Sequence, residues 1–169
     1  MAHIVYNPVL KVEDLKVGQS IETEGRTIFE SDVLAFCGLV GDTNPVHLNE
    51  SLARSGPWGH LLVPATLTAS MAIGLFGTSK WLHAILMPFI GMAEWRVERP
   101  VFPRDTIRAT VTVRGIRQTS DGRRHILELL IEVFAERGAG NTLPDAPALE
   151  RVMTFNPKFM IQNREVTVM

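Results

Sequence analysis

The sequence predicts an α+β domain in which an antiparallel sheet wraps around one buried helix. Three observations lead to this class. Residues 65–76 are largely apolar and carry no charged side chain, a pattern typical of a helix enclosed on all sides. After residue 90 the chain reads almost entirely as strands. Between two of those strands, Ser120-Asp121-Gly122 predicts a hairpin turn, and hence antiparallel neighbours.

Length and composition fit a single domain over residues 1–169, with an irregular N-terminal segment and a C-terminal tail. Apolar residues make up 46% of the 169 residues and charged residues 21%, an ordinary globular balance. Seventeen basic and eighteen acidic residues give a formal net charge of -1, without a long run of like charge. The basic excess or stripe of a nucleic-acid-binding protein is missing, so we expect no such partner.

We expect a cytoplasmic protein that does not enter a membrane. A single cysteine, Cys37, cannot form an internal disulfide, which fits a reducing compartment. It falls on an apolar helix face, which favours a packed core thiol over a nucleophile. The N-terminus lacks a basic region followed by an apolar core, so it does not resemble a signal peptide. The apolar stretch 64–77 is too short to span a bilayer.

The first half of the chain is predicted to alternate short elements with turns. Residues 9–19 are expected to form a loop, and 20–29 a first strand with partial alternation and β-branched residues. A short helix over 32–39 follows from the i, i+3, i+4, i+7 spacing of its apolar positions, Val33, Phe36, Cys37 and Val40.

Gly41 is a stop signal for that helix. Pro45 disfavours the helical region at Asn44, so we expect the chain to become extended there. Residues 49–55 predict about one more helical turn, and 55–60 a loop. Pro64 suits the entry to the buried helix over 65–76, because the first N–H of a helix is unpaired in any case.

The second half predicts four strands. Alternation is clear over 90–99 and 106–116, whereas 125–136 is more continuously apolar. A loop is expected over 138–147, followed by a last strand over 148–155. Beyond Pro157 no period is recognisable, and we assign no structure there.

The turn over residues 40–48 concentrates the side chains that can carry chemistry. Asp42, Asn44 and His47 leave it as a carboxylate, an amide and an imidazole. A turn broken by proline can fold such groups toward one point. An acid and a titratable base beside one cavity can hold a water, remove its proton and return a proton elsewhere. The alternative interpretation is a polar surface turn with a solvated histidine.

This turn, Gly41-Asp42-Thr43-Asn44-Pro45-Val46-His47, resembles the signature of the MaoC-like, R-specific enoyl-CoA hydratases. In that family a small-residue turn and a long buried helix follow at a fixed distance, and residues 63–71 take that place here without a gap. The resemblance covers about residues 12–156. It implies the hotdog fold, and a homodimer, or a higher oligomer of dimers, whose sheets join edge to edge. A shared sheet would also cover the exposed sheet edge.

The resemblance further implies hydration of 2-enoyl-CoA, or the reverse dehydration of a 3-hydroxyacyl thioester. The N–H groups of Ala65 and Thr66, at the start of the buried helix, would polarise the thioester carbonyl. Asp42 and His47 would hold and activate the water, and Asn44 would orient the site. We expect no cofactor, and no cluster of side chains has the spacing of metal ligands.

Two departures from the family pattern concern the buried helix. The family usually has His-Gly at its start, where this chain has Pro64-Ala65. Alanine keeps the N–H donor, but its methyl group restricts the approach of an acyl chain. Some R-hydratases carry a serine further along this helix, and Ile73 aligns with it here.

Other residues are weaker candidates. Trp58, Trp81 and the stretch 82–89 could line an acyl pocket or simply pack in the core or at a dimer interface. His60 could line an entrance for CoA, although an exposed loop histidine is the simpler reading. Two other functions stay open: a hotdog thioesterase and a non-catalytic acyl-CoA-binding subunit. The first typically needs a carboxylate on or beside the central helix, which 65–76 lacks, and the second should lack one of Asp42 and His47.

Overall fold

The computed structural model describes residues 11–82, 85–141 and 147–163. Its sheet has the order β1-β5-β6-β7-β3, with β2 also paired to β5 and β4 also paired to β7. Every pairing is antiparallel. The strands are β1 Ser20–Glu22, β2 Arg26–Thr27, β3 Ile85–Leu86, β4 Phe89–Val97, β5 Thr106–Gln118, β6 His125–Glu136 and β7 Leu149–Asn163. The helices are α1 Glu30–Val40, α2 Pro45–Leu48, α3 Glu50–Ser55 and α4 Ala65–Thr78, preceded by a 3-10 turn over Val12–Asp14.

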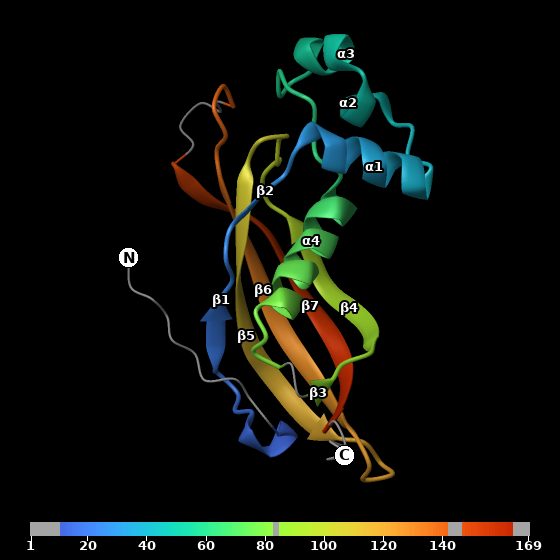
Figure 1. Cartoon of the computed structure of the whole chain (residues 1–169), viewed down its shortest axis with the longest axis vertical. Helices are drawn as coiled ribbons and strands as arrows, with labels where there is room; N and C mark the ends of the chain where they lie inside the picture. The colour runs from blue at the N-terminus through green and yellow to red at the C-terminus, as the bar shows by residue number, and fades with distance from the viewer. Residues whose placement is uncertain (1–10, 83–84, 142–146, 164–169) are drawn as a thin grey trace, which may run out of the picture.

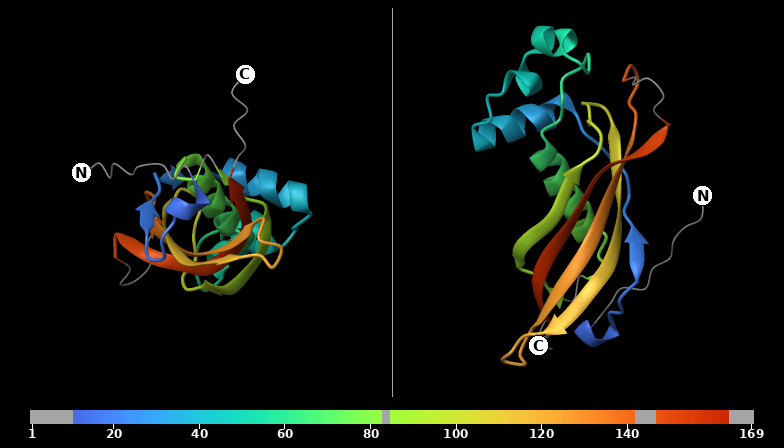
Figure 2. Two further views of the ribbon diagram at one scale, coloured as in Figure 1. Left: turned by 90° about the horizontal axis from the view of Figure 1, so that it is seen from below. Right: turned by 180° about the vertical axis from the view of Figure 1, so that it is seen from behind.

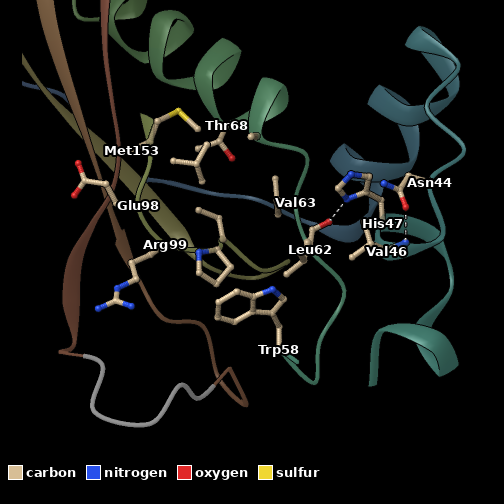
Figure 3. A pocket seen from close by; sticks show the side chains of 14 residues that line it. Asn44, Val46, His47, Trp58, Leu62, Val63, Thr68, Glu98, Arg99 and Met153 are labelled. Atoms are coloured by element: carbon tan, nitrogen blue, oxygen red, sulfur yellow. Dashed lines mark hydrogen bonds between the residues drawn. The ribbon is translucent and has the colours of Figure 1, made fainter. Parts of the chain in front are cut away.

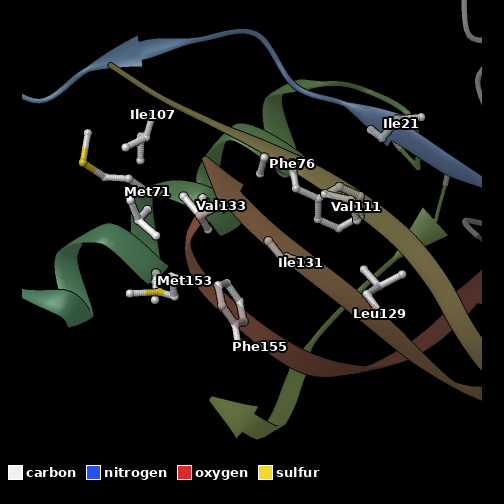
Figure 4. Packing of buried hydrophobic residues seen from close by; sticks show 14 of the residues in the cluster. Ile21, Met71, Phe76, Ile107, Val111, Leu129, Ile131, Val133, Met153 and Phe155 are labelled. Carbon is white, nitrogen blue, oxygen red and sulfur yellow. The ribbon is translucent and has the colours of Figure 1, made fainter. Parts of the chain in front are cut away.

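The sheet curls around α4, as the views from the front and from below show (Figures 1 and 2). This arrangement confirms the α+β class. Burial alternates residue by residue along the first half of β5 and most of β6, so one face of each strand is buried in the apolar interior. The inward-facing residues form one apolar cluster (Figure 4), which includes Met71 and Phe76 of α4 and, from the strands, Ile107, Val111, Leu129, Ile131, Val133, Met153 and Phe155.

The helix α4 is not enclosed on all sides, and this corrects the sequence-based expectation. Thr66, Ser70, Gly74 and Gly77 are exposed along one face, whereas Ala72 and Phe76 are buried against the sheet. The absence of charge therefore does not mark complete burial within this chain. The exposed face consists of small side chains, which would let another backbone approach it closely.

The last strand continues well past Pro157, although no periodic pattern predicts a strand there. β7 ends at Asn163. The register with β6 is the same on both sides of the proline, since Ile131 pairs with Phe155 and Glu128 with Lys158. Proline removes one N–H from the ladder without shifting the strand, and β4 and β6 hold β7 from both sides.

The first predicted strand is divided into β1 and β2. Thr23 lies between them, buried, and its hydroxyl oxygen accepts a hydrogen bond from the Ala109 N–H at 2.9 Å. The Thr23 N–H still donates to the Ala109 carbonyl at 2.9 Å, so the side-chain oxygen replaces only the backbone acceptor of the ladder. Among the described residues no helix has the length and apolarity needed to cross a membrane.

Helices α1, α2 and α3 lie together beyond one end of the sheet, next to the N-terminal end of α4 (Figure 1). The chain passes from α3 through residues 56–64 directly into α4. The turn that carries Asp42, Asn44 and His47 therefore lies at the end of α4 whose N–H groups are unpaired.

Candidate active site

The turn after α1 is built by a glycine, an asparagine cap and a proline. Gly41 adopts a left-handed conformation (φ 74°) that ends α1, and the Asp42 N–H donates back to the Cys37 carbonyl. The Asn44 side chain caps α2 by accepting from the Val46 N–H at 3.2 Å. Asn44 is extended as expected, but Pro45 then begins a single helical turn, because proline suits the first helical position. His47 thus lies on a short helix and not on an extended segment.

The His47 ring is oriented by a backbone carbonyl. Its Nδ1 lies 2.7 Å from the carbonyl oxygen of Leu62, in the segment that leads into α4. A carbonyl can only accept, so Nδ1 carries the hydrogen and donates. In the neutral ring Nε2 is then left with a free lone pair. Only 12% of this side chain is exposed, so the tautomer is fixed within a largely enclosed site.

Asp42 and His47 converge, as their spacing around the turn predicts. Asp42 Oδ2 lies 3.7 Å from His47 Nε2, too far for a direct hydrogen bond. One water placed about 2.8 Å from each atom would bridge them. The other carboxylate oxygen, Oδ1, accepts from the Asn44 N–H at 3.1 Å, which fixes the carboxylate plane. The pair can therefore hold a water between an acceptor nitrogen and an acceptor oxygen.

The start of α4 presents free N–H groups beside this pair. The first hydrogen bond of the helix runs from the Thr68 N–H to the Pro64 carbonyl, so the N–H groups of residues 65–67 have no acceptor within the helix. Two backbone bonds fix this helix end in place. The Leu62 N–H donates to the Val46 carbonyl at 3.0 Å, and the Val63 N–H donates to the Val101 carbonyl at 2.8 Å.

A cavity of about 440 Å³ connects the turn with the start of α4 (Figure 3). Asn44 and His47 line it on the side of the turn, and Thr68 lines it on the side of α4 (Figure 3). Ala65, at the start of α4, is a further lining residue. Its other walls are largely apolar: Val46, Trp58, Leu62, Val63, Val97, Glu98, Arg99, Pro100, Val101 and Met153. An apolar cavity with a few convergent polar groups is the usual form of a small-molecule site.

The sequence-predicted site residues are not all placed alike. Asn44, His47 and Ala65 line the cavity, whereas Asp42 is within 3.7 Å of His47 Nε2 but is not among the lining residues. Thr66 is exposed and does not line the cavity, so of the two predicted helix donors only Ala65 contributes to its wall. Trp58 lines the cavity, but Trp81 is buried in the core and packs edge-on against Phe76.

Other candidates from the sequence have structural partners. Residues 83 and 84 lie outside the described residues. His60 is half-buried against the Phe102 ring and belongs to a different, polar cavity. Burial, and in second place the Asp42 carboxylate, raises the pKa of the Cys37 thiol, so this cysteine is not an activated nucleophile. No group of three His, Cys, Asp or Glu side chains within 11–82, 85–141 and 147–163 could hold a metal ion.

Sequence reasoning missed the wall formed by residues 97–101 and Met153. The alternation over 90–99 and 106–116 indicated only two strands with a break between them, and no local signal shows that the Val101 carbonyl accepts from the Val63 N–H. The contact between the Leu62 carbonyl and His47 could not be predicted either, because every residue has a backbone carbonyl and the residue type does not show which one accepts a hydrogen bond.

Comparisons with known proteins identify the family and the fold. The family model described as "MaoC like domain" matches residues 13–130. An (R)-specific enoyl-CoA hydratase of Rhodospirillum rubrum is 36% identical over 104 residues, which is 62% of this chain and 69% of that protein. A beta-methylmalyl-CoA dehydratase of Chloroflexus aurantiacus is 28% identical over 163 residues, 89% of this chain but only 46% of that protein. The solved MaoC-like dehydratase of Rhodospirillum rubrum superposes with a TM-score of 0.75 at 24% identity, covering 94% of this chain and 100% of that one.

Proposed function

The chain belongs to the MaoC-like domain family and has its hotdog fold, and from that premise we propose that it acts as a single domain that hydrates 2-enoyl-CoA. In the reverse direction it would dehydrate a 3-hydroxyacyl thioester. The observation that carries the proposal is the gap between Asp42 and His47 beside the start of α4. His47 shares a cavity with the start of α4, and Asp42 lies 3.7 Å from His47 Nε2; a water-binding group next to a helix N-terminus is what addition of water to an enoyl thioester requires.

The Ala65 N–H is the proposed partner of the thioester carbonyl. As electron density moves onto that oxygen, the β-carbon becomes electrophilic, and a free N–H at a helix N-terminus stabilises the developing charge. Thr66 is exposed, so we assign this role to Ala65 alone. The apolar walls around the helix start, Val63, Val97 and Val101, then contact the acyl group.

Asp42 and His47 are the proposed catalytic pair. The water between Nε2 and Oδ2 gives its oxygen to the β-carbon and one proton to the pair, and the pair returns a proton to the α-carbon. Hydration is thereby balanced without a cofactor. Asn44 caps α2 and donates its backbone N–H to Asp42, so it is proposed to hold the turn that brings both groups together.

The two alternative functions are less well supported. A thioesterase needs a carboxylate at the thioester, and α4 has none. Glu98 is the one carboxylate among the cavity-lining residues, but it accepts hydrogen bonds from Arg151 and Thr154 and is thereby held away from the helix start. A non-catalytic subunit has no need of the fixed His47 tautomer.

We expect the wild-type protein to remove the conjugated double bond of one or more compounds in a panel of 2-enoyl-CoAs of increasing chain length. The measurement is the decrease in enoyl-thioester absorbance with time. Matched saturated acyl-CoAs serve as the control and should release no free thiol. Thiol release from the saturated series would instead support a thioesterase. Binding without either reaction would support the acyl-CoA-binding subunit.

We also propose a cytoplasmic homodimer, alone or within a larger oligomer of dimers, in which β4 joins a second copy. Within the described residues β4 pairs only with β7, so its outer edge is open. Four apolar side chains on this strand are about half exposed: Phe89 51%, Ile90 47%, Trp95 42% and Val97 55%. An unprotected edge of this kind favours pairing with another strand, and the small-residue face of α4 leaves room for a neighbour.

Light scattering should therefore report at least a dimer at micromolar concentration. Trp95→Glu should weaken association by roughly 100-fold or more, because it would bury an unpaired charge at the interface. Val17→Glu is the matched control, since Val17 is 67% exposed but lies in the loop before β1. A monomeric wild type, or equal effects of both substitutions, would contradict an interface at β4.

A further inference from the structure

A buried ionic cluster lies close to the candidate site and contacts residues of the cavity wall, although its own side chains do not line the cavity. It consists of Asp105, Arg137, Asn141 and Glu150, and we call it the Arg137 cluster. Asp105 is fully buried, and the side chains of Arg137 and Glu150 are each only 9% exposed. Arg137 directly follows β6, and Glu150 lies at the start of β7. None of these four residues lines the 440 Å³ cavity.

Asp105 is the centre of this cluster and accepts four hydrogen bonds. Its Oδ1 accepts from the Gly138 N–H at 3.0 Å and from Asn141 Nδ2 at 2.7 Å. Its Oδ2 accepts from the Phe102 N–H at 3.0 Å and from Arg137 Nη1 at 2.6 Å. Both oxygens are thus fully used, and one of the four donors belongs to the backbone of the segment between β4 and β5.

Arg137 holds the same segment a second time. Its Nη1 donates to the Pro100 carbonyl at 3.0 Å, its Nη2 binds Glu150, and its guanidinium carbon lies 5.1 Å from the centre of the Phe102 ring. The fork of the guanidinium therefore spans two carboxylates and a carbonyl, a geometry that lysine cannot reproduce. The cluster fixes the backbone on both sides of Val101.

Val101 is the point at which the segment meets the candidate site. Its carbonyl accepts from the Val63 N–H at 2.8 Å. Leu62, the preceding residue, accepts from His47 Nδ1 and donates to the Val46 carbonyl. Ala65, two positions further on, carries the proposed carbonyl donor. One displacement of Val63 would therefore move the histidine acceptor and the start of α4 together.

We infer that Arg137 is a positioning residue for the reaction, acting through Val101 and Val63 on His47 and Ala65. The inference rests on the proposed function. Buried ionic groups add little net stability compared with well-packed apolar side chains, so stability alone does not account for this cluster. A small misplacement of reacting groups, by contrast, strongly lowers rate.

The test compares Arg137→Lys with wild type in steady-state hydration of 2-enoyl-CoA. Lysine keeps the charge but cannot bind Asp105, Glu150 and Pro100 at once. We expect kcat to fall by roughly 10- to 100-fold, with KM changed by less than about threefold. Asp105→Asn, which cannot accept all four donors, should give the same separation of kcat from KM even if Arg137→Lys does not fold.

Two controls separate positioning from loss of stability. Leu129→Ala creates a cavity in the middle of β6, where Leu129 is fully buried, and should lower Tm but leave kcat near the wild-type value. Lys158→Met removes the surface ion pair between Lys158 of β7 and Glu128 of β6, neither of which lines the cavity, and should leave both Tm and kcat near the wild-type values. If kcat follows Tm across all four variants, or if Arg137→Lys and Asp105→Asn keep wild-type kcat, the inference is overturned.

Amide hydrogen exchange at Val63 gives a readout that does not need activity. In Arg137→Lys it should be at least about 10-fold faster than in Leu129→Ala, compared at equal stability, because the Val101 acceptor is no longer held. Unchanged Val63 exchange would overturn the inference. A wild type that fails to hydrate any enoyl-CoA would instead refute the proposed function, and Val63 exchange would still decide whether Arg137 positions this segment.

Discussion

Asp42→Asn and His47→Gln should each lower kcat for hydration of 2-enoyl-CoA by roughly 100-fold or more, the usual effect of removing a positioned acid or base. Asparagine keeps the shape of the aspartate side chain, glutamine keeps a polar group in place of the imidazole, and neither can exchange a proton. Because the two groups are expected to act on one water, the double variant should lose little beyond the worse single variant. Steady-state kinetics of the three variants provide the measurement.

All three variants should stay folded, because neither Asp42 nor His47 belongs to the apolar core. Thermal unfolding followed by circular dichroism checks this. His60→Gln is the matched control for His47: its ring is half-buried and packs on Phe102, but it lines a different cavity. Hydration at the wild-type rate by His47→Gln would defeat the assignment of the pair.

Ala65→Pro should lower kcat by roughly 10²- to 10³-fold, the range observed when one oxyanion donor is removed. The substitution removes the backbone N–H, and the backbone conformation at this position is compatible with proline. Proline is favoured at the first residue of a helix. Pro64 already has φ -53° and ψ 130°, the conformation that a residue before proline prefers. The fold should therefore survive the loss of the donor.

Ala65→Gly is the matched control, because it keeps the N–H and only removes the methyl group. It should retain kcat within a few-fold of wild type. If Ala65→Pro is folded and its kcat also stays within a few-fold, the carbonyl is not bound at this N–H. The role assigned to the start of α4 would then be wrong.

Much of the architecture could be predicted because local patterns decide it. The alternation of apolar residues over 106–116 and 125–136 corresponds to β5 and β6, and the charge-free stretch 65–76 corresponds to most of α4. The extension of β7 past Pro157 could not be predicted, since the missing N–H is compensated by neighbouring strands that are distant in sequence. The open face of α4 was missed because absence of charge does not reveal what covers a helix.

The convergence of Asp42 and His47 could be predicted from the sequence, but the cavity wall and the backbone contacts that support the two side chains could not. The spacing of Asp42 and His47 around the turn predicted that their side chains converge, and their nearest side-chain atoms are 3.7 Å apart. The Leu62 carbonyl that fixes the His47 tautomer belongs to the backbone, and its position depends on Val101 in the segment between β4 and β5. Contacts of this kind are set by tertiary packing, so residue type and spacing do not indicate them.

The structure of the Asp42→Asn variant with a 2-enoyl-CoA bound tests the central claim most directly, because slow turnover should preserve the substrate. The thioester oxygen is expected within about 3 Å of the Ala65 N–H. The β-carbon should face the gap between residues 42 and 47. A thioester bound elsewhere, for example in the polar cavity lined by Arg54, His60 and Arg104, would contradict the assignment of this site.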